Sequence, residues 1–401
     1  MLKKLIEKLQ DGQRRHQERG TPLGLQYVIA DGISFVNPAH WDAVADGQTI
    51  FLSRAYLAVL DAHSPSNTVQ RYAVIYQGTK PVGIVACQIA EISGAQLAPS
   101  EDDSHPKTKV LGTLRERVLV CGNLVSSGLH GVAFAEGLDD ELGWRAVAEV
   151  LYRIRRGEKL GGTIDFVMVK DLKGEQFAHS EVLRRYSYRA IQSDPDMVLE
   201  LEKPCSTFAD YLALLTSKYR SKIKKLGTTL DKAGFVIETL DDLQPVQSEL
   251  HRLYLEVESR APVRLATISP GYFSAMRNAL GDKFVCSVIR RDHAIVGFVT
   301  TVIDRSEAVG YYVGVDYEVN AQYPIYLRLL QLIIADGVAQ GCRKISFGRT
   351  ALEPKANLGA KPVDAHVWMR HRVPALNFLL RKLFAVVPYD EAPQRSPMKK
   401  R

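Results

Sequence analysis

The feature that most constrains the fold of this chain is an internal repeat. Residues 74–85 and residues 288–299 lie 214 positions apart, and each segment has an apolar run, a short polar turn and a second run that begins with Val-Gly. This pattern is typical of an antiparallel hairpin. A short helix-like segment precedes each copy, at residues 53–57 and 269–273, with the almost equal offset of 216.

Further segments follow each hairpin in the same order. They are the strand-like runs 116–121 and 308–316, the helical stretches 141–156 and 322–340, and the final strand-like runs 163–169 and 344–348. The order helix, hairpin, strand, helix, strand therefore occurs twice, which predicts a tandem duplication of one α/β domain. The alternative is one large mixed α/β domain whose halves are similar by coincidence.

Composition agrees with two folded domains. The chain has 401 residues, of which 46% are hydrophobic and 24% charged, and about 150 residues per domain is usual. The five cysteines form no C-x-x-C pair and the ten histidines form no H-x-x-x-H pair, so we expect neither a disulfide framework nor a metal site. No apolar run is typical of a signal peptide or a membrane span, which predicts a cytoplasmic protein.

The net charge of +7 is concentrated in three places, namely the first 20 residues, residues 218–225 and residues 399–401. Such clusters permit an anionic partner without demonstrating one. We expect an amphipathic helix over residues 1–22, a first domain over 23–200, a second and active domain over 201–388, and a disordered basic tail over 389–401. Prolines at 195 and 204 are expected to break the chain at the domain junction, and residues 97–108 to form an exposed loop.

Residues 376–387 are apolar with two basic side chains. They predict a helix that docks on the second domain, with membrane contact as the alternative.

A series of motifs in the second half carries a resemblance to a known family. In order, they are SKYRSKIKKL at 217–226, LYLEV at 253–257, IVGF at 295–298, YYVGVDY at 311–317, YPIYL at 323–327, FGRT at 347–350 and KANLGA at 355–360. They resemble the GNAT acyltransferases of the Fem-like and BioF-like group, and the resemblance spans roughly residues 30–385. It implies an α/β (α+β) fold of two tandem GNAT-like domains, each with a mixed, mostly antiparallel sheet flanked by helices.

The sequence leaves two alternatives for the acyl donor. GNAT enzymes hold the pyrophosphate of CoA with a glycine-bearing loop, but residues 316–324 contain no glycine. In the first half, residues 122–131 are rich in glycine and lack the basic residue of that loop. Acyl-CoA as a co-substrate, with no permanently bound cofactor, and aminoacyl-tRNA, the donor that the Fem-like resemblance implies, are the two alternatives.

The resemblance places the active crevice between residues 311–317 and 345–350. Glu256 is the predicted general base and Tyr326 a second catalytic residue; Asn320 and Tyr323, at the start of the following helix, are predicted to bind the donor. Arg220, Arg349 and Lys355 are predicted to bind the substrate, because guanidinium and ammonium groups hold phosphates and carboxylates. The alternatives are a surface glutamate, a solvated helix face and ordinary loop charges.

Together these patterns predict an N-acyltransferase that passes an acyl or aminoacyl group directly to an amine or hydroxyl. The acceptor would be a small molecule or a cell-envelope precursor. The alternative from another class is a non-catalytic GNAT-fold module that recognises an anionic envelope precursor, a polymer or a protein. Weak peripheral membrane contact through the amphipathic ends is a third hypothesis, and no DNA partner is expected.

Overall fold

The structure is a computed structural model that describes residues 21–97, 115–261, 263–384, 393 and 395–399. We call residues 21–200 the first half and residues 201–399 the second half. The predicted helix over residues 1–22 and the predicted loop over residues 97–108 lie almost entirely outside the described residues.

The first half contains β1 (Gln26–Ala30), α2 (Pro38–Ala45), α3 (Arg54–Ala62), β2 (Thr68–Gln77), β3 (Lys80–Ser93), β4 (Arg115–Cys121), β5 (Val132–Phe134), α5 (Asp140–Gly157), β6 (Phe166–Leu172), α6 (Gly174–His179) and β7 (Arg189–Glu200). The second half contains α7 (Phe208–Leu214), α8 (Ser217–Lys232), β8 (Val236–Thr239), α9 (Gln247–Glu258), α10 (Tyr272–Leu280), β9 (Phe284–Arg291), β10 (Ala294–Asp304), β11 (Glu307–Val315), α11 (Tyr317–Gln322), α12 (Ile325–Ala339), β12 (Lys344–Ser346), α13 (Leu352–Ala356), β13 (Lys361–His371) and α14 (Pro374–Phe384).

Both predicted hairpins are confirmed, and they share an irregularity. In β2–β3 the partners step from Gly83 to Pro81, so Val82 is an extra residue in the ladder. In β9–β10 they step from Ile295 to Gly297, so Val296 is the extra residue. Val82 and Val296 are 214 positions apart. A bulge at the same place in both copies supports the interpretation that one unit was duplicated.

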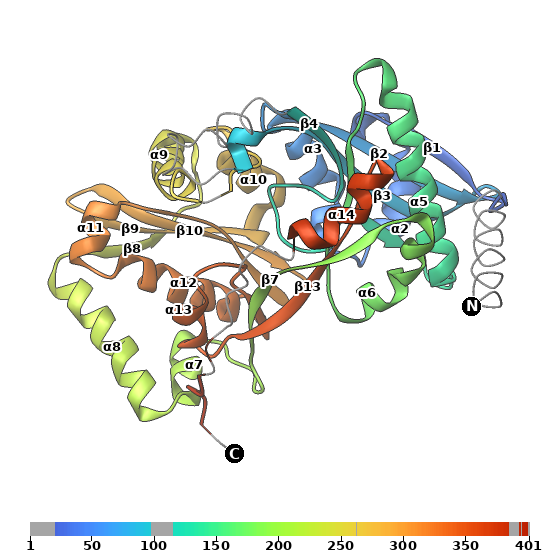
Figure 1. The fold of residues 1–401 in the computed structure, drawn as a ribbon. Helices are drawn as coiled ribbons and strands as arrows, with labels where there is room; N and C mark the ends of the chain where they lie inside the picture. The colour runs from blue at the N-terminus through green and yellow to red at the C-terminus, as the bar shows by residue number, and fades with distance from the viewer. Residues whose placement is uncertain (1–20, 98–114, 262, 385–392, 394, 400–401) are drawn as a thin grey trace.

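The α/β fold of two GNAT-like units is confirmed, but the two sheets are joined into one. Across the described residues the strands form a 13-stranded sheet, and its main path runs β1-β2-β3-β4-β6-β13-β7-β12-β11-β10-β9-β8. At its centre, β13 from the end of the second half pairs with β6, while β7 from the end of the first half pairs with β12. Figure 1 shows β7 and β13 crossing between the two halves. Each half thus supplies a strand to the other.

The predicted chain break at residues 194–196 is wrong. These residues lie inside β7, where the register against β13 shifts between the pairs Asp196–Val363 and Ser193–Ala365. Pro195 falls at this irregularity, and a strand tolerates a proline at a bulge because no ladder hydrogen bond is lost there.

The helix predicted over residues 322–340 is shorter than expected. A separate helix, α11, ends at Gln322, and α12 begins at Ile325 after Pro324. Tyr323, the residue before the proline, is extended, as the ring of a following proline favours.

The tail is not disordered throughout. Thr216 donates its backbone N–H to the carbonyl of Pro397, and Lys399 donates its own to the carbonyl of Leu214. Met398 packs against a cluster of buried residues, most of which belong to the second half. These contacts order residues 397–399, contrary to the prediction for 389–401.

The main core runs through both halves. One continuous cluster contains Trp41 and Tyr56 from the first half and Tyr272 and Phe273 from the second, all with no exposed surface. The two halves therefore share one hydrophobic core.

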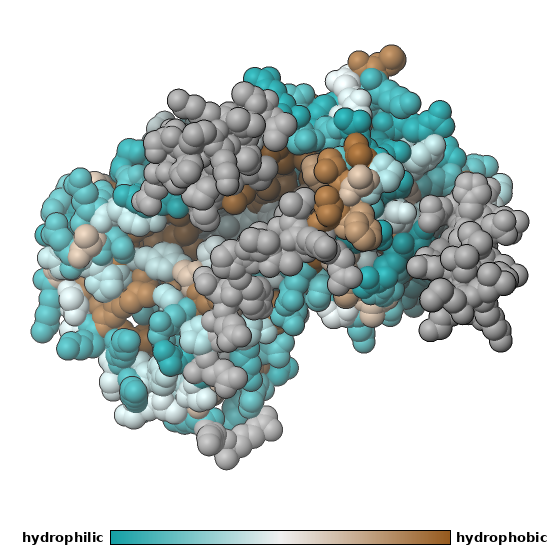
Figure 2. Space-filling view, in the orientation of Figure 1, coloured by the Kyte–Doolittle hydropathy of each residue, from teal (hydrophilic) through white to brown (hydrophobic). Residues whose placement is uncertain are grey.

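Helix α14 contacts β7 of the first half and β13 of the second, so it docks where the two halves meet and not, as predicted, on the second domain alone; it buries Leu380. Its other face leaves Leu376, Phe378 and Leu379 exposed, and Figure 2 shows a hydrophobic patch over this helix. In the described part of the chain, no helix combines the length and the apolar character needed to cross a membrane.

Candidate functional site

A gap opens in the sheet where β11 and β12 separate. The two parallel strands pair over only three positions, from Glu307–Lys344 to Val309–Ser346, and then diverge. Beyond this point no described strand pairs with the edge of β11 that faces β12, so backbone groups of that edge are available to a ligand. A cavity of about 400 Å³ lies in the gap, at the place where the crevice was predicted.

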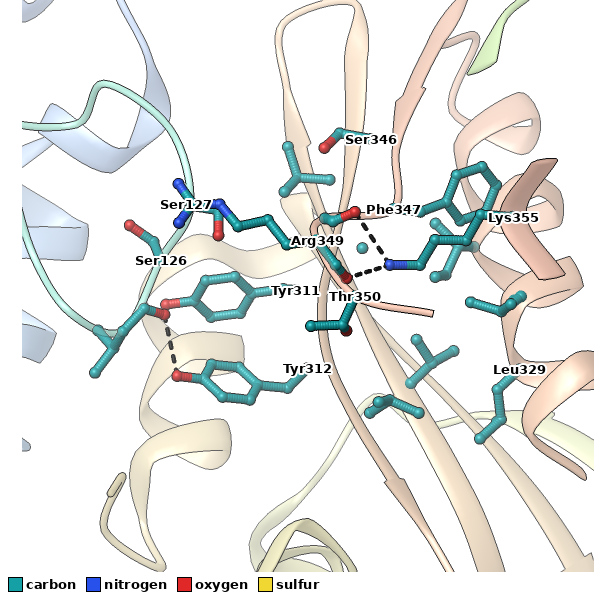
Figure 3. Close-up of a pocket in the computed structure, with 18 of the residues that line it drawn as sticks. Ser126, Ser127, Tyr311, Tyr312, Leu329, Ser346, Phe347, Arg349, Thr350 and Lys355 are labelled. Atoms are coloured by element: carbon teal, nitrogen blue, oxygen red, sulfur yellow. Dashed lines mark hydrogen bonds between the residues drawn. The ribbon is translucent and has the colours of Figure 1, made fainter. Parts of the chain in front are cut away.

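The wall of the cavity comes from both halves. The first half contributes Leu124, Val125, Ser126, Ser127 and Lys170; the second contributes Leu265, Val299, Val309–Val313, Tyr326, Leu329, Leu330, Ile333, Ser346–Thr350 and Lys355. Leu329, Leu330 and Ile333 of α12 form an aliphatic part of the wall, and Figure 3 shows Arg349 extending toward Ser127, away from Leu329. The cavity is therefore suited to a ligand with an apolar part and a polar part.

Tyr311 is an extra residue in β11. The partners in β10 step from Thr300–Tyr312 to Thr301–Gly310, so Tyr311 forms a bulge beside the gap. A bulge turns the strand locally and re-aims its backbone groups. The Tyr312 N–H donates to the Thr300 hydroxyl at 3.0 Å, so a backbone donor that stabilises an oxyanion in the cavity would have to come from another residue of β11.

Tyrosine hydroxyls connect the halves behind this bulge. The Tyr311 hydroxyl lies 2.5 Å from that of Tyr272 and 3.2 Å from that of Tyr56, and the Tyr312 hydroxyl donates to the carbonyl of Val125 at 3.0 Å. Burial raises the pKa of both Tyr311 and Tyr312, so both remain protonated near neutral pH. Figure 3 shows the two rings side by side, pointing toward the first-half loop.

Lys355 holds the segment that follows β12. Its Nζ donates to the carbonyls of Gly348 at 3.0 Å and Arg349 at 2.5 Å. Gly348, Thr350 and Ala351 all have positive φ angles, which is a strained backbone conformation for residues other than glycine. The two hydrogen bonds from Lys355 help to hold the segment in it. Burial lowers the pKa of Lys355 to about 8, although Asp196 opposes the shift. Lys355 thus orients the loop that carries Arg349.

Arg349 crosses from the second half to the first. Its guanidinium forms an ion pair with Asp171, whose side chain is 1% exposed, and Figure 3 shows it reaching toward Ser127. The same carboxylate lies 2.9 Å from Nζ of Lys170. Burial lowers the pKa of Arg349.

The equivalent gap of the first half is filled by its own chain. Strands β4 and β6 are also parallel and part after the pair Cys121–Val169. Lys170, the next residue of β6, donates to the carbonyls of Asn123 at 2.9 Å and Ser126 at 2.6 Å. The returning chain is so close that a Cβ on Gly131 would lie 2.2 Å from the backbone N of Gly122. Residues 123–126 are therefore held against the end of β6 by Lys170.

Side chains also occupy the helix starts near the second gap. The Asp316 carboxylate accepts the backbone N–H groups of Glu318 and Val319, and the Asn320 side chain accepts that of Tyr326 at 2.9 Å. In a glycine-rich phosphate loop such N–H groups would be open to an anion. Asn320, predicted to bind the donor, is thus engaged in capping α12.

The predicted site residues separate into two groups. Tyr326, Arg349 and Lys355 line the cavity. Glu256, Asn320, Tyr323 and Arg220 lie outside its wall: Glu256 accepts from Arg252 at 2.6 Å and from the Tyr317 N–H at 3.3 Å, Tyr323 lies beneath the Arg291 guanidinium, and Arg220 is in α8.

The sequence analysis missed the contribution of the first half. Ser126, Ser127 and Lys170 line the cavity, and Asp171 supports it. The glycine-rich run 122–131 is the local signal for this contribution, but its composition was interpreted only as a possible phosphate loop. Nothing in the local sequence indicates that this run faces the second half.

Residues 216–372 match the acetyltransferase (GNAT) domain family, and they contain β11, α12, β12 and the separation between the two strands. Most of the second half is therefore similar to this domain family. A comparison with curated proteins finds no match to the chain.

Solved structures with low sequence identity share the fold. FemX has a TM-score of 0.55 at 10% identity, covering 89% of this chain and 100% of its own. A tandem GNAT protein from the clavulanic acid biosynthesis pathway has a TM-score of 0.51 at 14% identity, covering 87% and 99%. A Bacteroides thetaiotaomicron protein of unknown function has a TM-score of 0.50 at 12% identity, covering 86% and 99%. The chain therefore has a tandem GNAT fold, as the motifs predicted.

Proposed function

We propose that this tandem GNAT protein transfers an acyl or aminoacyl group to an amine or hydroxyl in the cavity between β11 and the segment after β12. The observation that carries the proposal is the separation of these strands after Val309 and Ser346. It leaves backbone groups of β11 unpaired beside a cavity of about 400 Å³. In direct acyl transfer, such groups hold the donor carbonyl and stabilise its developing negative charge.

Tyr326 is the proposed proton donor to the leaving group. It lines the cavity, and burial raises the pKa of its hydroxyl to about 12. The group is therefore protonated near neutral pH and can act as an acid. Glu256 remains the base predicted from the sequence, although its contacts with Arg252 and Tyr317 place it outside the cavity wall.

The capping of α11 favours a donor that does not depend on a pyrophosphate at this helix start. Asp316 places a carboxylate on the two N–H groups that would otherwise face an anion, and like charges repel there. An aminoacyl ester or an acyl group on another carrier fits this arrangement better than acyl-CoA.

The test is product formation with defined donors. Acetyl-CoA, longer acyl-CoAs and aminoacyl-tRNAs are each incubated with a panel of amines, and acylated product is measured by mass spectrometry. We expect transfer from at least one donor class, and a Tyr326→Phe variant with kcat lowered by about 10²-fold or more, typical of losing an acid. Glu256→Gln is the paired variant for the base. Absence of transfer from all donors would favour the non-catalytic binding module.

A further inference from the structure

Positive charge is in excess at the seam between the halves. Lys170, Lys173, Arg349 and Lys355 are gathered around two carboxylates, Asp171 and Asp196, which are 1% and 3% exposed. Asp171 pairs with both Lys170 and Arg349, while Lys173 lies 2.5 Å from Asp196. Within the described residues of this cluster, four cations share two anions. Buried charge without a counterion is costly, so such an arrangement favours a bound anion.

The cations differ in what they can still bind. Lys170 directs its ammonium group at three acceptors, the carbonyls of Asn123 and Ser126 and the carboxylate of Asp171. Lys355 is committed to two backbone carbonyls. Arg349 donates one N–H group to Asp171, and its other N–H groups have no acceptor among the described residues. Because a guanidinium carries five N–H donors in a fork, Arg349 is the cation that can contact a ligand directly.

The position of Arg349 makes these free donors accessible. Its side chain is 26% exposed, and it lines the cavity beside Ser127. Asp171 holds one edge of the guanidinium, which fixes the orientation of the others. A planar group held in this way can bind a carboxylate or phosphate through two parallel hydrogen bonds.

Neighbouring groups respond to the same positive field. Burial and then the charge of Arg349 lower the pKa of Lys170 to about 7, and the Asp171 carboxylate lies 2.9 Å from its Nζ. Burial lowers the pKa of His130, which belongs to the glycine-rich run 122–131, and the charges of Lys170 and Lys173 lower it further. A bound anion would relieve this unfavourable potential.

We propose that Arg349, supported by Lys170 and Asp171, forms an anion subsite shared by the two halves, which holds the carboxylate or phosphate of the acyl acceptor. Assigning the anion to the acceptor rests on the proposed function. The aliphatic wall of Leu329, Leu330 and Ile333 on α12 suits the acyl chain, whereas Arg349 and Lys170 bring positive charge to the side of the cavity where both contact Asp171. Two reactants that meet beside β11 must occupy different ends, so the acceptor takes the charged end. In this proposal the residues beside the first-half gap, Ser126, Ser127 and Lys170, form part of the second-half site.

The first experiment measures anion binding by itself. Thermal midpoints of the full chain are recorded in inorganic phosphate and in acetate, at constant ionic strength set with chloride, for the wild type, Arg349→Gln and Arg349→Lys. Arg54→Gln is the matched control, because Arg54 pairs with Asp42 on the surface and lies outside the cavity wall. We expect phosphate or acetate to raise the midpoint of the wild type and the control, with a smaller rise for Arg349→Lys and none for Arg349→Gln. An equal rise in all four proteins would overturn the proposal.

The second experiment uses acceptor pairs that differ in the anionic group. Glycine is compared with glycinamide, and phosphoethanolamine with ethanolamine, using a donor that supports transfer. We expect kcat/KM to favour one anionic member by about tenfold or more, the usual effect of a charge-assisted hydrogen bond. The ratio should fall toward one in Arg349→Gln, lie between in Arg349→Lys and stay unchanged in Arg54→Gln. The pair that is discriminated identifies the carboxylate or the phosphate.

The two experiments separate the subsite from the proposed function. Transfer without preference for either anionic acceptor overturns the subsite and leaves acyl transfer standing. Stabilisation by an anion that requires Arg349, combined with no transfer from any donor, supports the subsite and rejects acyl transfer.

Discussion

Asp336 shows at the level of one residue how a buried charge couples stability to pH. It lies in α12 and accepts the hydroxyl of Ser287 at 2.9 Å and that of Thr301 at 3.0 Å. Burial raises the pKa of its carboxyl from 3.8 to about 6, although both hydrogen bonds oppose the shift. The folded state therefore binds this proton more tightly than the unfolded chain does. The contribution of Asp336 to stability falls as pH rises from about 4 to about 6.

Asp336→Asn should remove this dependence. The amide keeps an acceptor and gains donors for the two hydroxyls while carrying no charge. Relative to the wild type, we expect the variant to gain up to about 3 kcal/mol of unfolding free energy between pH 4 and pH 7.5, because one pKa unit corresponds to about 1.4 kcal/mol. Urea unfolding at both pH values measures the difference. Asp282→Asn, whose carboxylate is 93% exposed, is the control, and a gain in Asp336→Asn that does not change with pH would contradict the assignment.

At the scale of elements, α11 replaces the glycine loop that many GNAT domains use. Its six residues begin after Asp316, whose side chain accepts two backbone N–H groups. Proline at 324 then separates α11 from α12. The prediction of a single helix over residues 322–340 placed its start too early, because apolar periodicity does not reveal the break between α11 and α12.

Substitution of Asp316 tests this capping role. Asp316→Ala should lower the unfolding free energy by about 1 kcal/mol, the usual cost of losing a helix cap. Asp316→Asn retains the acceptor oxygen and should cost only a few tenths of that amount. Urea unfolding at pH 7.5 compares the two variants with the wild type. Equal losses in both variants would mean that the negative charge, and not the cap, is what matters.

The whole molecule is held together by the exchange of β7 and β13. Ser346 of β12 donates its hydroxyl to Asp196 of β7, and both residues are buried. A half made by itself would expose the strand edge that its partner covers, and such edges promote aggregation. The boundary predicted at residue 200 divides the chain in sequence, but the strands before and after it belong to one continuous sheet.

We expect one cooperative unfolding transition for the full chain in calorimetry. Residues 1–200 and 201–401 produced separately should be insoluble or unfolded, whereas the two fragments expressed together should purify as a complex, because each supplies a missing strand. Two resolved transitions, or two folded and independent fragments, would contradict a single folding unit.

The sequence determined the repeated units and both hairpins. These features depend on local periodicity and on turn and cap chemistry, which neighbouring residues encode. The resemblance to the Fem-like and BioF-like group, carried by the motifs of the second half, placed Tyr326, Arg349 and Lys355 near the crevice between residues 311–317 and 345–350.

Tertiary structure alone decided what the crevice contains. The ion pair between Arg349 and Asp171 joins residues 178 positions apart, and Ser126, Ser127 and Lys170 reach the cavity only because β7 and β13 bring the two halves into one sheet. Such contacts follow from how distant strands pair, and no local pattern in the chain specifies that pairing.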